Sequence, residues 1–126
     1  MLPIACPKPA DFYIWYFNLS SEEIWVEVHG FSSMASPGRL TPSRDTGLLS
    51  STEISYAYNP PTIDDVITIS WSKTEGGPAK EVQFKRSEYG IPRKAWYGKL
   101  TVIFTAAEKW ELKYTVEEKN SKQVSE

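Results

Sequence analysis

Short stretches in which apolar and polar residues alternate constrain the fold of this chain most strongly. In residues 66–72, Ile67, Ile69 and Trp71 alternate with hydroxyl side chains, and residues 109–117 alternate aromatic or aliphatic with charged and polar side chains. A period of two is typical of a β-strand with one face on the core, whereas a helix would show a period of 3.6. The chain is therefore expected to be built from strands.

Seven such strands are expected, and no stretch has the pattern of an amphipathic helix. Short turns predict three hairpins, which join the first strand to the second, the fourth to the fifth, and the sixth to the seventh. This arrangement predicts an all-β fold, either an antiparallel, immunoglobulin-like β-sandwich or a partly open barrel. The seven stretches are 12–18, 22–31, 52–58, 66–72, 81–85, 99–105 and 109–117.

The 126 residues fit one domain, which we place at residues 11–117. Residues 1–10 hold three prolines and predict an extended leader. Residues 118–126 are polar and charged, and we expect them to form a disordered tail. Two irregular segments, 32–51 and 89–98, predict long loops of the kind that often have functional roles.

The residues offer little support for catalysis, so we expect a binding protein and not an enzyme. His29 is the only histidine and Cys6 the only cysteine, so neither a nucleophile with its base nor a tetrahedral zinc site is apparent. We therefore expect no metal and no cofactor. A net charge of -2 argues against a nucleic-acid partner, and no apolar run is long enough to be a transmembrane segment.

Arginine and aromatic residues in the two irregular segments are the candidate partner-binding residues, because these residue types dominate binding hot spots. Trp96 has a second interpretation, in which its ring seals the end of the sandwich. The alternative function is a carbohydrate-binding or other envelope-binding module, in which Trp15, Tyr16 and Trp25 form a platform on one sheet face. The candidate partner-binding residues are Arg39, Arg44, Tyr89, Arg93, Trp96 and Tyr97.

Four stretches of the sequence carry a resemblance to a known family. They are the run Leu2-Pro3-Ile4-Ala5-Cys6 with its Pro-Lys-Pro spacer, the segment from Asn18 to Gly30, residues 66–71, and residues 98–110. Together they resemble small bacterial lipoproteins encoded beside phospholipase effectors of the type VI secretion system. The resemblance implies a periplasmic, membrane-anchored immunity protein that is lipidated at Cys6. It would bind a phospholipase effector through its loops and inhibit it.

Overall fold

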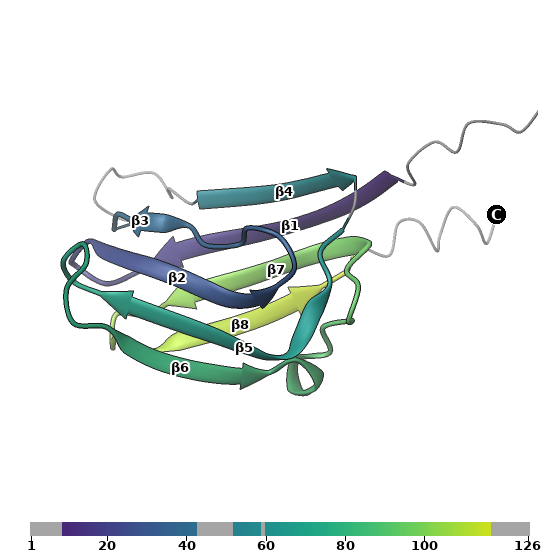
Figure 1. The fold of residues 1–126 in the computed structure, drawn as a ribbon. Helices are drawn as coiled ribbons and strands as arrows, with labels where there is room; N and C mark the ends of the chain where they lie inside the picture. The colour runs from purple at the N-terminus through teal and green to yellow at the C-terminus, as the bar shows by residue number, and fades with distance from the viewer. Residues whose placement is uncertain (1–8, 43–51, 59, 117–126) are drawn as a thin grey trace, which may run out of the picture.

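A computed structural model describes residues 9–42, 52–58 and 60–116. Within these residues the chain forms eight strands and one short 3₁₀ helix, arranged as two stacked sheets of four strands (Figure 1). The predicted all-β sandwich is thus confirmed. The elements are β1 (Pro9–Asn18), β2 (Ile24–Phe31), β3 (Gly38–Leu40), β4 (Thr52–Tyr58), β5 (Ile63–Ser72), β6 (Lys80–Lys85), η1 (Arg86–Tyr89), β7 (Tyr97–Phe104) and β8 (Trp110–Thr115).

One sheet has the strand order β4-β1-β7-β8 and the other has the order β3-β2-β5-β6. All neighbours are antiparallel except β1 and β7, which run parallel with Ile14 opposite Leu100. The first sheet is therefore mixed, because strands from the two ends of the chain lie side by side at its centre. This pairing also places the starts of β1 and β7 at the same end of the sandwich.

The predicted hairpin between the first two strands is wrong, because β1 and β2 lie in different sheets. Asn18 is buried where the chain crosses, and its Nδ2 donates to the carbonyl oxygens of Glu22 at 2.7 Å and Leu40 at 3.0 Å. The amide of Asn18 thus fixes a crossing between layers. The other two hairpins, β5–β6 and β7–β8, are confirmed by their antiparallel registers.

The core lies between the sheets and is rich in aromatic rings. Trp71 and Trp110 are both buried, as predicted, and their ring centroids are 5.7 Å apart in an edge-on arrangement. Phe104 packs against both of them, at 5.8 Å from Trp71 and 4.8 Å from Trp110. Such edge-on and tilted contacts add to the free energy gained by burying the rings.

Several element boundaries differ from the prediction. β1 begins at Pro9, inside the expected leader, and β5 begins at Ile63, three residues early. The three-residue β3 lies within the segment that was expected to be irregular, and Tyr97 is the first residue of β7 and not part of a loop. A three-residue strand shows too little alternation to be recognised.

Candidate functional site: the rim that closes one end of the sandwich

The segment between η1 and β7 closes one end of the sandwich. Ile91 and Ala95 turn inward and are 2% and 0% exposed, so these two side chains fill the gap between the sheets. Four of the six predicted partner-binding residues belong to this end of the molecule. We call the five residues Tyr89, Arg93, Lys94, Trp96 and Tyr97 the rim.

Backbone hydrogen bonds attach this segment to both sheets. The amide nitrogen of Ile63, in β5, donates to the carbonyl oxygen of Arg93 at 2.6 Å. On the other side, the amide nitrogen of Asp11, in β1, donates to the carbonyl oxygen of Trp96 at 2.8 Å. Since β1 and β5 belong to different sheets, the segment spans the sandwich and its backbone is fixed at both sides.

The start of the segment is fixed by η1. The ring of Tyr89 packs edge-on against the buried Phe84 of β6, with centroids 5.6 Å apart. Arg86 is mostly covered and donates through Nη1 to the carbonyl oxygen of Ile91 at 3.0 Å. Tyr89 therefore contributes to packing, and its predicted role in partner binding is limited to the part of its half-buried side chain that remains accessible.

The outward side chains of the rim combine positive charge with aromatic surface. Arg93 and Lys94 are exposed, Tyr97 is 43% exposed and Trp96 is half-buried. The ammonium of Lys94 lies 5.2 Å from the centre of the Trp96 ring, a distance at which a cation is attracted to the ring face. Ile91 and Ala95 are the buried side chains at this end of the sandwich, whereas Trp96 is only partly covered.

The structure does not bring all of the predicted binding residues together. Arg39 lies in β3, opposite Trp25 of β2, and forms an ion pair with Glu23. β3 is near the end of β1, whereas Tyr97 lies beside Asp11 near its start, so Arg39 and the rim occupy opposite ends of the sandwich (Figure 1). The remaining predicted residues, Arg44 and Cys6, are outside the described part of the chain.

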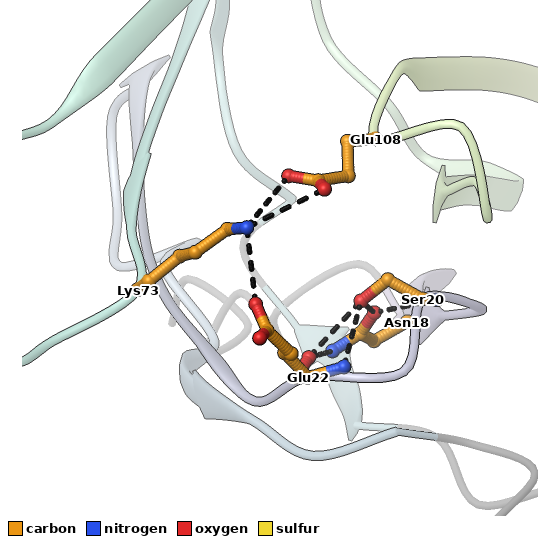
Figure 2. A network of polar contacts seen from close by, with 5 residues as sticks. All are labelled: Asn18, Ser20, Glu22, Lys73 and Glu108. Atoms are coloured by element: carbon orange, nitrogen blue, oxygen red, sulfur yellow. Dashed lines mark hydrogen bonds and ion pairs between the residues drawn. The ribbon is translucent and has the colours of Figure 1, made fainter.

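The opposite end holds a polar cluster that sequence patterns did not reveal (Figure 2). The Nζ of Lys73, in the β5–β6 turn, lies 3.0 Å from a carboxylate oxygen of Glu22 and 3.3 Å from one of Glu108. Hydrogen bonds to Glu22 and then Glu108 raise the pKa of Lys73 above its ordinary value. The three residues come from three different turns, so no local pattern could have related them.

This cluster surrounds a small pocket of about 160 Å³, but its charged side chains are open to solvent. Exposed ion pairs contribute little to stability, because water screens them and the long side chains lose freedom. Both carboxylates form an ion pair with the same lysine, so we interpret the cluster as a contact that links the three turns.

The predicted aromatic platform for sugars is wrong. Tyr16 is 1% exposed, and its hydroxyl donates to the carbonyl oxygen of Ala35 at 2.6 Å inside the core. Trp15 and Trp25 are half-buried on the outward faces of β1 and β2, which belong to different sheets. Period two identified the inward residues of β2 and β5, but it was not applied to the adjacent residues Trp15 and Tyr16, which point to opposite faces of β1. Nor could it indicate which strands share a sheet.

His29, the one histidine of the sequence, is largely exposed, and its Nε2 lies 3.6 Å from a carboxylate oxygen of Glu27. In residues 9–42, 52–58 and 60–116, no three His, Cys, Asp or Glu side chains gather as they would around a metal ion. No helix in the same part of the chain is long and apolar enough to cross a bilayer.

No family model and no curated protein matches the chain.

Proposed function

We propose that this chain is a non-catalytic protein that docks onto a partner protein through the rim. The observation that carries this proposal is the contrast between a fixed backbone and exposed side chains. The segment is hydrogen-bonded to both sheets through Arg93 and Trp96, while the side chains of Arg93, Lys94 and Tyr97 point to solvent. A surface fixed before binding loses less conformational entropy on association, so more of the contact energy appears as affinity.

The chemistry of the rim favours a partner with an acidic, partly apolar surface. Arg93 and Lys94 form no ion pair with any residue in the described ranges, so their charge is available to a partner. Arg, Tyr and Trp are the residue types that contribute most to protein–protein hot spots. Complementary charge would also accelerate the encounter between the two proteins.

For the identity of the partner we rely on the sequence resemblance. We propose that the partner is a phospholipase effector of the type VI secretion system, and that this chain is the immunity protein that inhibits it. The protein would act in the periplasm and be anchored to the membrane through a lipid on Cys6. The rim would enter or cover the substrate cleft of the enzyme, and the rigid sandwich would keep it there.

A binding and inhibition experiment tests this proposal. The domain, used as bait, is incubated with an extract of the source bacterium that contains its secretion effectors, and captured proteins are identified by mass spectrometry. We expect a phospholipase effector to be captured, and its hydrolysis of phospholipid vesicles to stop when the domain is added. Capture of a phospholipase that stays fully active would contradict inhibition, and an effector that passes the bait unbound would contradict the partner.

A further inference from the structure

A second surface, on the outward face of the sheet β3-β2-β5-β6, forms a groove of about 330 Å³. Trp25 and Glu27 of β2 lie directly opposite Ser72 and Ser70 of β5 and form its floor and one side. The turn between β5 and β6 provides the other side, through Glu75 and the glycines that follow it. We propose that this groove binds a neutral saccharide, with one sugar ring packed on Trp25.

The groove combines the groups that sugars require. A sugar ring presents a C–H face, which packs on a flat aromatic surface, and a rim of hydroxyls, which need hydrogen-bond partners. Trp25 supplies the aromatic surface and is half-buried, so its position is restrained. Carboxylates such as Glu27 and Glu75 accept strong hydrogen bonds from hydroxyls, since one partner in each bond is charged. Ser70 adds a hydroxyl that can donate or accept.

Charge around the groove selects a neutral ligand. Two carboxylates and no basic side chain line it, so phosphates and acidic sugars are repelled. Arg39 lies opposite Trp25 on the neighbouring strand β3, but its charge is paired with the carboxylate of Glu23, so it does not offset this repulsion of anions. A polar, uncharged ligand with many hydroxyls avoids that repulsion.

This site is separate from the rim. The rim closes the end of the sandwich where β1 and β7 begin, whereas the groove lies on the outward face of β2 and β5, where Trp25 pairs with Ser72. Saccharide binding is therefore independent of the proposed function, and either can fail without the other.

Isothermal titration with neutral hexasaccharides of glucose, mannose and N-acetylglucosamine tests the inference. We expect at least one of them to bind at micromolar to millimolar concentration, and Trp25→Ala to weaken that binding by at least about tenfold. Trp15→Ala is the matched control, because Trp15 is also a half-buried, outward tryptophan but lies on the other sheet. This control variant should bind like the wild type.

Glu75→Gln gives a second, milder variant, since this exposed side chain lies in a turn and the substitution keeps its shape. We expect Glu75→Gln to weaken binding several-fold while the melting temperature stays unchanged. The inference is overturned if no neutral hexasaccharide binds at millimolar concentration, or if Trp15→Ala and Trp25→Ala weaken binding equally. It is also overturned if an arginine-rich peptide binds in a Trp25-dependent manner and the sugars do not.

Discussion

Arg86 and Ile91 are joined by a hydrogen bond in which the guanidinium Nη1 donates to the carbonyl oxygen at 3.0 Å. The same guanidinium donates through Nη2 to the carboxylate of Asp65 at 2.9 Å. The side chain of Arg86 is only 18% exposed, whereas that of Asp65 is 85% exposed. Because Ile91 begins the segment that closes the sandwich, this covered arginine holds the rim in position.

We expect Arg86→Ala to lower the free energy of unfolding by roughly 1.5–3 kcal/mol, the range for losing a hydrogen bond that involves a charged group. The loss leaves the carbonyl of Ile91 without its partner at the base of the rim. Urea denaturation followed by tryptophan fluorescence measures the change. Asp65→Ala is the control, and it should cost no more than about 1 kcal/mol because its carboxylate is in solvent. Equal losses for the two variants would mean that the ion pair, and not the contact with Ile91, is what matters.

Tyr16 provides a second test, inside the core. We expect Tyr16→Phe to lower the free energy of unfolding by about 1–2 kcal/mol, because the carbonyl oxygen of Ala35 loses its buried donor while the ring stays in place. Chemical denaturation at neutral pH measures this effect. A variant as stable as the wild type would show that water replaces the hydroxyl at no cost.

The same residue makes stability depend on pH. Burial, and secondarily the proximity of Tyr56, raises the pKa of the Tyr16 phenol above its ordinary value. Below about pH 10 the phenol is protonated in both the folded and the unfolded chain, so its contribution is fully present. As the pH rises above about 10, only the unfolded chain loses this proton, and the free energy of unfolding falls by up to about 1.4 kcal/mol per pH unit.

Urea denaturation between about pH 9 and about pH 11 tests this dependence. Tyr16→Phe should show a shallower decline than the wild type, and the part that remains includes Tyr56 and Tyr114, whose pKa values burial also raises. Identical declines for wild type and variant would show that Tyr16 does not ionise differently in the two states.

Gly98, next to the rim, tests the close approach of β7 and β8. It has a φ of +110°, and a Cβ there would lie 2.8 Å from the carbonyl oxygen of Thr115. We expect Gly98→Ala to destabilise the protein by about 1–3 kcal/mol, through backbone strain and this contact. In the control, Gly76→Ala, φ is also positive but a Cβ meets nothing within 4 Å, so the melting temperature should fall less. An equal fall in melting temperature for the two variants would show that the positive φ, and not the contact with Thr115, causes the destabilisation.

Local patterns in the sequence were sufficient for much of the fold. Ile67, Ile69 and Trp71 show a clear period of two, and they do face the core. The hairpins β5–β6 and β7–β8 join strands that are adjacent in sequence, so a short turn was enough to predict their pairing. Alternation reports on the two faces of a strand, and these strands each have one buried face.

Relationships between distant residues could not be predicted. A short turn after Asn18 predicted a hairpin, but β1 and β2 lie in different sheets, and the buried side chain of Asn18 is hydrogen-bonded to the distant Leu40 where the chain crosses. The parallel pairing of β1 with β7 joins residues more than eighty positions apart, such as Ile14 and Leu100. For the same reason, Arg39 and Arg93 were both predicted to be partner-binding arginines in loops, although the strand topology places them at opposite ends of the sandwich.

The most direct test of the proposed function compares the affinity of three proteins for a purified phospholipase effector by surface plasmon resonance. The first is the wild type, the second carries Arg93→Ala with Tyr97→Ala, and the third carries Arg39→Ala at the opposite end. Arg93, Tyr97 and Arg39 are all exposed, so each protein should keep its melting temperature. We expect the rim variant to raise Kd by about 100-fold, as for the loss of hot-spot residues, and Arg39→Ala to stay close to the wild type. A rim variant that binds like the wild type, or a larger loss for Arg39→Ala, would contradict docking through the rim.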